Sequence, residues 1–297
     1  MAKTTDREHI RIRREEEKRL RLEREAAERR GRQLKALGIV LGALVVIGGI
    51  VALAIFGPTW FGPKAAQFTA NGTVPVTTSE GDEVEVPITS QDGGAAIQVG
   101  QPDAPVTIDY WYDFSCPHCI DYHLATSQTI HDLAASGQAK INFRPIHIVA
   151  PYGQEAGAAL LSVVQHQPES FFAVYDGLFL IPAQEQQTWG PAEYADAMGQ
   201  FGVTDETILA EIRAGTMKPT VEQNTEKATG KDGIKGTPAV AVNGQIQSTL
   251  PDGPGFLQLV ADNGGDLAQV PTASPAATEP AATEPASTEP AATPTNG

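Results

Sequence analysis

The chain of 297 residues has little cysteine, and beyond its first 35 residues it has few basic side chains. It holds two cysteines, Cys116 and Cys119, so any intramolecular disulfide must join these two. A loop this short removes little chain entropy, which excludes a fold held together by disulfides. Residues 1–35 hold 13 basic and 8 acidic side chains, which leaves 8 basic and 28 acidic for the rest. That acidic body argues against a nucleic-acid partner, which needs positive charge to displace phosphate counterions.

Long apolar runs are also scarce, and the chain has one, at residues 36–56. Its 21 residues reach roughly 30 Å as a helix, the thickness of the hydrocarbon core of a bilayer. The basic arm before it predicts a cytoplasmic N-terminus and an extracytoplasmic remainder. The alternative is a cleaved signal peptide, since Ala52-Leu53-Ala54 resembles a cleavage site. The run continues past Ala54 and the arm is long for a signal peptide, so we expect an uncleaved, single-pass anchor in the cell membrane.

The two cysteines lie in the motif Cys116-Pro117-His118-Cys119, directly after an apolar run at residues 106–112 that favours a strand. A C-x-x-C pair between a strand and a helix is typical of thioredoxin-like redox motifs. A helix start stabilises a thiolate at Cys116, and Pro117 suits the first turn. Protonated, or as an N–H donor, His118 adds to this stabilisation. Because these effects favour the reduced form, the motif predicts an oxidant with Cys116 as nucleophile and Cys119 as resolving thiol. No bound cofactor is expected beside this redox-active disulfide.

A second motif lies about 120 residues later. Gly236-Thr237-Pro238 precedes the short apolar run 239–242, and a proline belongs at the first residue of a strand because it cannot donate to the ladder. Asn243-Gly244 then favours a hairpin to a strand at residues 246–248.

The remaining pattern predicts an α/β chain. Strands are expected at residues 106–112 and 141–146, with a helix at 116–136 between them, and a helical block fills about 150–216. Within and after that block the expected helices are 156–164, 171–180, 191–201, 205–214, 221–229 and 256–261. This order looks like a thioredoxin fold with an inserted helical block, plus one N-terminal transmembrane helix and a disordered C-terminal tail.

Residues 96–265 resemble the DsbA-type thiol:disulfide oxidoreductases, in the membrane-anchored form of Gram-positive-type bacteria. The resemblance is carried by residues 99–108, by Asp113-Phe114-Ser115 followed by the C-P-H-C motif, and by Gly236-Thr237-Pro238. It implies that Pro238 is cis and faces the cysteines, and that Thr237 and Pro238 position the client. It also implies cysteine-containing secreted clients and a quinone-linked membrane oxidoreductase as recycling partner.

One position departs from the pattern of that family. Many relatives have an acidic residue six positions before the first cysteine, where this chain has Tyr110. Asp109 is one residue earlier and is expected on the opposite face of the strand. Proton transfer to and from Cys119 is therefore expected to use water or another group, such as Asp113.

The segments around the folded unit are simpler. Residues 57–95 contain several prolines and a Gly93-Gly94 pair, so we expect an extracytoplasmic spacer with one short strand at 84–88. Within residues 266–297 the chain repeats, from Pro275 onward, a five-residue Pro-Ala-Ala/Ser-Thr-Glu unit that has almost nothing to bury. We expect a disordered tail there, either O-glycosylated or wall-spanning. The expected domains are a cytoplasmic charged arm at 1–35, the anchor at 36–56, the spacer at 57–95, the thioredoxin-like domain at 96–265 and the tail.

Other functions remain open at this point. The same fold serves disulfide reductases and isomerases, and a non-enzymatic surface scaffold would leave the cysteines without a role. Cys116, Cys119 and His123 offer three metal ligands, but zinc usually takes a second ligand pair that the chain lacks. The other expectation for His123 and His131 is a surface position on the helix, and His147 and His166 lie in no motif.

Overall fold

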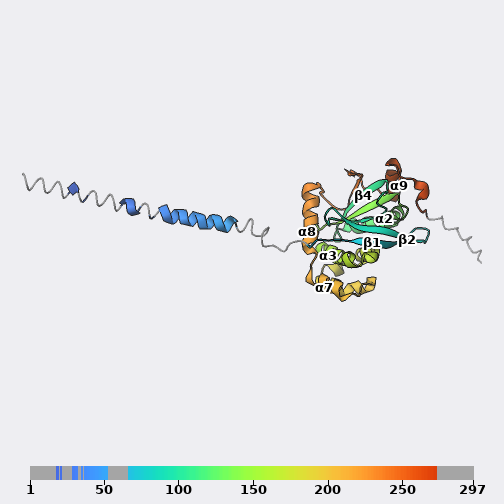
Figure 1. Ribbon diagram of the computed structural model, residues 1–297, viewed down its shortest axis with the longest axis horizontal. Coiled ribbons are helices and arrows are strands. Elements are labelled where there is room, and N and C mark those ends of the chain that lie inside the picture. The colour runs from blue at the N-terminus through green and yellow to red at the C-terminus, as the bar shows by residue number, and fades with distance from the viewer. Residues whose placement is uncertain are drawn as a thin grey trace, which may run out of the picture. The chain divides into compact units, whose positions relative to one another are not determined.

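The computed structural model describes residues 18–19, 21, 29–32, 35, 37–52 and 66–272. The chain divides into two compact units, Met1–Pro63 and Lys64–Gly297 (Figure 1). In the first, the helix Arg29–Ala52 is long and apolar enough to cross a membrane, a property that a signal sequence shares. Most of the charged arm, residues 53–56 of the expected anchor and residues 273–297 of the tail lie outside the described residues.

The second unit is built on a seven-stranded sheet with the order β1-β2-β3-β5-β4-β6-β7. Its central strand β4 is buried along nearly its whole length and pairs parallel with β5 and antiparallel with β6. A buried parallel pair needs a crossover helix, which α2 supplies. The strands are β1 Asn71–Thr77, β2 Glu83–Gln91, β3 Ala96–Val99, β4 Val106–Tyr112, β5 Ala139–Pro145, β6 Ala239–Val242 and β7 Gln245–Ile246.

The predicted helical block is present between β5 and β6. Its helix α3 packs against α7 and α8, with α7 on the side away from the sheet (Figure 1). After β7 the chain forms α9, which packs against α2. The helices are α2 Pro117–Ala135, α3 Pro151–His166, α4 Phe171–Leu180, α5 Ala183–Gln186, α6 Pro191–Ala197, α7 Glu206–Ala214, α8 Lys218–Glu226 and α9 Gly253–Asp262.

The core between α2, α4 and the sheet is rich in aromatic rings. Tyr112, Phe114 and Tyr175 are at most 2% exposed, and the rings of Phe114 and Tyr175 each lie 5.2 Å from the ring of Tyr112. Phe179 adds a ring 4.6 Å from that of Phe114. The two pairs with Tyr112 are edge-to-face, an arrangement that adds to the stability gained from burial. This cluster fixes α4 of the helical block against the strand and turn that precede the cysteines.

Two boundary expectations are wrong. The expected strand at 84–88 is confirmed within β2. The spacer reading is otherwise wrong for this part of the chain, because β1 and β2 form an antiparallel hairpin that extends the sheet. Two of the prolines that suggested a spacer fit this hairpin. Pro75 lies in the edge strand β1, and Pro87 lies outside the register in which β2 pairs with β3. The tail reading fails for residues 266–270, because Gln138 binds the backbone N–H of Asp266 and Val270 is buried.

Candidate active site

Cys116 lies at the start of α2, where its backbone is extended and the helix begins at Pro117. Its backbone N–H donates to the carbonyl of Asp113 at 3.0 Å, which closes a tight turn at residues 113–116, here called the redox turn. Its own carbonyl accepts the N–H of Cys119 at 2.9 Å. Pro117 and His118 are exposed, while Cys116 is 3% and Cys119 is 0% exposed. Both cysteines are free thiols, so the structure shows the reduced pair.

The second predicted motif meets the first in space. The peptide between Thr237 and Pro238 is cis, as predicted. The sulfur of Cys116 lies 3.2 Å from the carbonyl oxygen of Thr237, across 121 residues of sequence. This contact follows from the sheet, because β6 begins at Ala239 and pairs with β4, the strand that leads to the redox turn. The hydroxyl of Thr237 is buried and makes no hydrogen bond of standard geometry among the described residues.

The surroundings of Cys116 lower the pKa of its thiol from 9.0 to about 5. The largest contribution is a hydrogen bond from the Cys119 thiol, which outweighs the opposing effect of burial. The Thr237 hydroxyl and the backbone N–H groups of Cys119 and His118 lower the pKa further. Hydrogen bonds to a charged group favour the charged form, so these donors keep Cys116 ionised at neutral pH. Among these contributions, that of His118 comes through its backbone.

Cys119 has the opposite environment. Burial raises the pKa of its thiol well above the ordinary value, and the hydrogen bond to Cys116 raises it further. The backbone N–H of Asp113 and the Thr237 hydroxyl oppose this rise without overcoming it. At neutral pH the reduced pair therefore holds one thiolate and one thiol. Because the thiolate is the reactive form, Cys116 is the nucleophile of the pair.

Comparisons with known proteins agree with this geometry. A family model described as Thioredoxin matches residues 92–260. The chain belongs to the thioredoxin family. Disulfide bond formation protein D of Bacillus subtilis is 26% identical over 157 residues, covering 52% of this chain and 70% of the relative. A probable disulfide bond formation protein D of Bacillus cereus is 20% identical over 231 residues, covering 72% and 90%.

Solved structures of other thioredoxin-like proteins share the fold. DsbA from Mycobacterium tuberculosis superposes with a TM-score of 0.51 at 20% identity, covering 59% of this chain and 95% of that one. BdbD from Bacillus subtilis superposes with a TM-score of 0.50 at 22% identity, covering 56% of this chain and 91% of that one. Together with the family match and the curated relatives, they confirm the predicted resemblance to DsbA-type enzymes and the predicted enzyme class, thiol:disulfide oxidoreductase.

Two tyrosines lie on the strand that leads to the redox pair, and one of them, Tyr110, takes the position where many relatives have an acidic residue. Tyr110 and Tyr112 are fully buried on the same face of β4, and burial raises the pKa of both phenols well above the ordinary value. Both tyrosines also interact electrostatically with Cys119. Asp109 faces the opposite side of the sheet, as predicted, and accepts hydrogen bonds from Arg144 and Asn142.

The histidines differ in part from expectation. His123 is buried, not on the surface, and its ring stacks on Phe179 with centroids 4.6 Å apart. Its Nε2 and that of His131 each lie 3.6 Å from an oxygen of Asp176 on α4. Burial lowers the pKa of both imidazoles to about 4 and raises that of Asp176 to about 7. Sequence gave no sign of this contact, because Asp176 lies 45 residues or more from either histidine.

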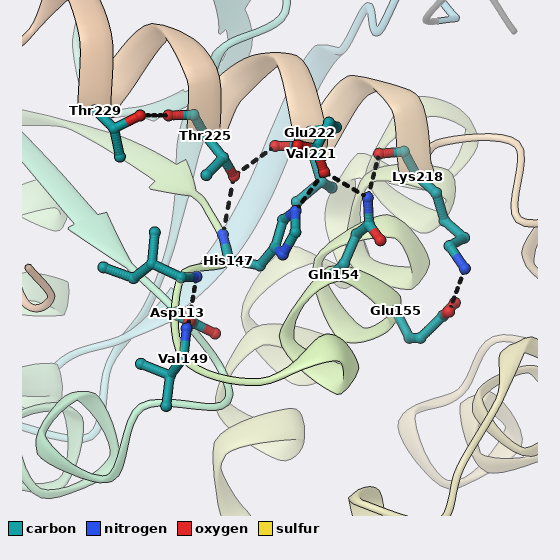
Figure 2. Close-up of polar contacts among 11 residues, drawn as sticks. Asp113, His147, Val149, Gln154, Glu155, Lys218, Val221, Glu222, Thr225 and Thr229 are labelled. Atoms are coloured by element: carbon teal, nitrogen blue, oxygen red, sulfur yellow. Dashed lines mark hydrogen bonds and ion pairs between the residues drawn. The ribbon is translucent and has the colours of Figure 1, made fainter. Parts of the chain in front are cut away.

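Among the described residues no group of three or more His, Cys, Asp or Glu side chains is arranged to hold a metal ion. His147 and His166 pair with Glu222 and Glu211 at 2.7 Å and 3.1 Å. Figure 2 shows His147 on the loop that follows β5, reaching toward Glu222 on α8.

The Thr237 hydroxyl gives a direct test of the electrostatics of the pair. Thr237→Val keeps the branched shape and removes the donor, so the pKa of Cys116 is expected to rise from about 5. The pH dependence of Cys116 alkylation in the reduced protein measures this. Thr237→Ser, which keeps a hydroxyl, is the matched control, and its Cys116 pKa is expected to stay closer to that of the parent protein. Equal shifts in both variants would show that the hydroxyl is not the cause.

Proposed function

We propose that this chain is an extracytoplasmic oxidase that donates disulfides to secreted or surface proteins through Cys116 and Cys119. The observation that carries the proposal is the asymmetry of the pair, with a lowered pKa at Cys116 and a raised pKa at Cys119. A stabilised thiolate is a good leaving group and favours the reduced form of the couple. The names of the Bacillus relatives, disulfide bond formation protein D, support the same direction.

The transfer has two exchange steps. A client thiolate attacks the sulfur of Cys116 in the oxidised pair, the bond between the two cysteines breaks, and Cys119 leaves and takes up a proton. A second client thiolate then attacks the client sulfur of the mixed disulfide, and Cys116 leaves as the stabilised thiolate. Two electrons pass from the client to the pair, and the client gains a disulfide. Pro238 and Thr237 lie against Cys116, where they would position the client backbone.

The N-terminal apolar helix supports a location at the membrane. We place residues 1–35 in the cytoplasm, the anchor at residues 36–56 in the membrane and the catalytic unit outside, and the apolar helix Arg29–Ala52 overlaps most of that anchor. Outside the cytoplasm the pair is not held reduced by glutathione or thioredoxin. A quinone-linked membrane oxidoreductase would then reoxidise Cys116 and Cys119.

Equilibration with a glutathione redox buffer tests the oxidase function against the reductase and isomerase alternatives. The oxidase proposal predicts a potential well above thioredoxin's value of about −270 mV. A couple as reducing as thioredoxin would rule it out.

The exposed imidazole of His118 is expected to make a smaller contribution. His118→Ala keeps the backbone N–H that lowers the pKa of Cys116, so we expect a rise in that pKa that is smaller than the rise in Thr237→Val. The couple should become slightly less oxidising. Alkylation profiles of the two variants, recorded side by side, measure the difference. A larger rise in His118→Ala would show that the imidazole is the main tuning group.

A further inference from the structure

Asp113 contacts the redox pair through its backbone at two points. Its carbonyl accepts the N–H of Cys116 at 3.0 Å, and its own N–H donates toward the sulfur of Cys119. The residue is fully buried, and its side chain has no cationic partner among the described residues. A buried carboxylate is costly unless its oxygens are hydrogen-bonded. The partners of this carboxylate therefore indicate what it is for.

The two carboxylate oxygens bind two different loops. Oδ1 accepts the backbone N–H and the hydroxyl of Ser115 at 2.8 Å and 2.6 Å, which forms an Asx turn inside the redox turn. Oδ2 accepts the N–H groups of Ile148 and Val149 at 2.8 Å and 3.0 Å. These two residues lie in the loop 147–150 that follows β5, here called the clamp loop, and Figure 2 shows Asp113 facing it.

Further bonds complete the connection between the two loops. The hydroxyl of Ser115 accepts the N–H of Ala150 at 2.9 Å, and the N–H of His147 is bound by the Thr225 hydroxyl at 3.0 Å. All four backbone N–H groups of the clamp loop thus donate to side chains. The acceptor sites of the Asp113 carboxylate are filled, so this side chain is better suited to fixing backbone than to carrying a proton for Cys119.

Gly153 leaves the space that this carboxylate occupies. A Cβ at Gly153, in the first turn of α3, would lie 2.1 Å from Oδ1 of Asp113 and 2.8 Å from the hydroxyl of Ser115. No real Cβ contact is this short, so a side chain at this position would displace the carboxylate. The chain therefore provides a way to move the Asp113 carboxylate without changing its charge.

We propose that Asp113 is a positioning residue, whose carboxylate fastens the redox turn to the clamp loop and so holds Cys116 at the start of α2. This role rests on the proposed function, because it matters for the reaction of Cys116 with its client. The donors that stabilise the Cys116 thiolate belong to the start of α2 and to Thr237. Their hydrogen-bond geometry to the sulfur of Cys116 therefore depends on the position of the redox turn. Positioning of this kind is what support residues supply at active sites.

The test compares Asp113→Asn and Gly153→Ala with the parent, as full chains in detergent. An amide cannot accept all four hydrogen bonds, and the Gly153→Ala methyl displaces the carboxylate. Both variants are expected to raise the pKa of Cys116 by about one unit, read as a shift in the pH profile of alkylation. A role through charge alone gives the opposite sign in Asp113→Asn, since removing a nearby negative charge lowers that pKa, and it gives no rise in Gly153→Ala, where the displaced carboxylate keeps its charge.

Asp109→Asn is the matched control. Asp109 is a buried carboxylate on β4 that binds Arg144 and Asn142 on the other face of the sheet, so its loss destabilises the unit without moving the redox turn. We expect it to lower the unfolding midpoint and to leave the pKa of Cys116 unchanged. If all three variants shift that pKa equally, or if Asp113→Asn and Gly153→Ala leave it unchanged, the positioning role is wrong. An ordinary pKa in the parent protein would instead contradict the proposed function.

Discussion

A Cys116→Ser variant is expected to transfer no disulfide to a reduced client protein. The remaining thiol, Cys119, is completely buried and its raised pKa keeps it protonated, so it cannot replace Cys116 as the attacked or attacking sulfur. Oxidation of a reduced, unfolded client, followed by trapping of its free thiols, measures the loss. A variant that retained activity, or a cellular phenotype that survived the substitution, would favour a scaffold whose cysteines have no role.

The partner substitution is expected to give a different result. Cys119→Ser leaves the nucleophile and removes the thiol that resolves its mixed disulfide. Incubated with a client that contains a disulfide, this variant should accumulate a covalent complex through Cys116, visible on a non-reducing gel and released by reductant. Cys116→Ser is the control that should form no such complex. The contrast assigns the two roles, and sequencing the trapped clients in cells identifies what the enzyme acts on.

The second large effect is a pH-dependent difference in stability between the reduced and oxidised forms. In the folded reduced protein the pKa of Cys116 is about 5, against 9.0 for the ordinary thiol. A group with a depressed pKa stabilises the folded state fully above its unfolded pKa, and this contribution is lost as the pH falls through the folded value. The oxidised form has no such thiol. Between these two pH values, the free energy of unfolding of the reduced form should therefore increase by about 1.4 kcal/mol per pH unit relative to that of the oxidised form. At neutral pH this amounts to roughly 3 kcal/mol.

Denaturant unfolding of both redox forms at several pH values measures this gain. Other titrating groups are common to the two forms. Cys119 stays protonated in the folded state throughout, and in the unfolded state below about pH 8, so below that pH the difference isolates Cys116. Thr237→Val raises the folded-state pKa of Cys116. The pH range over which the reduced form becomes more stable than the oxidised form should then begin at a higher pH. A stability difference that does not vary with pH would mean that folding does not stabilise the thiolate.

The redox motif could be predicted from the sequence because its chemistry is local. Cys116 and Pro117 indicate the start of a helix directly. The placement of Asp109 on the face of β4 opposite to Tyr110 follows from the alternation of side chains along a strand. The approach of Thr237 to Cys116 across 121 residues was reachable only through the family resemblance. The strand at 84–88 could be predicted and lies within β2, but β1 and its pairing with β2 could not. Pro75 usually breaks a strand, and it is tolerated in β1 because β1 forms the edge of the sheet.

The supporting contacts were less accessible, because they join distant segments without a pattern. Asp113 binds N–H groups 35 and 36 residues away, and a backbone donor carries no side-chain identity that a sequence could reveal. Gly153 gave one usable sign, a glycine in the first turn of a helix, but its reason appears only when the carboxylate of Asp113 is seen beside it. For His123 the sequence carries no such sign, because its partner Asp176 lies in the helical block, far away along the chain.

The central claim is that the start of α2, Cys119 and Thr237 together keep Cys116 ionised in the reduced protein. Titration of Cys116 in the full-length reduced chain, followed by the rate of its alkylation from acid to alkaline pH, tests this most directly. The structure predicts a single midpoint for Cys116 at about 5, with Cys119 unreactive throughout. A midpoint near the ordinary thiol value of 9.0 would contradict it.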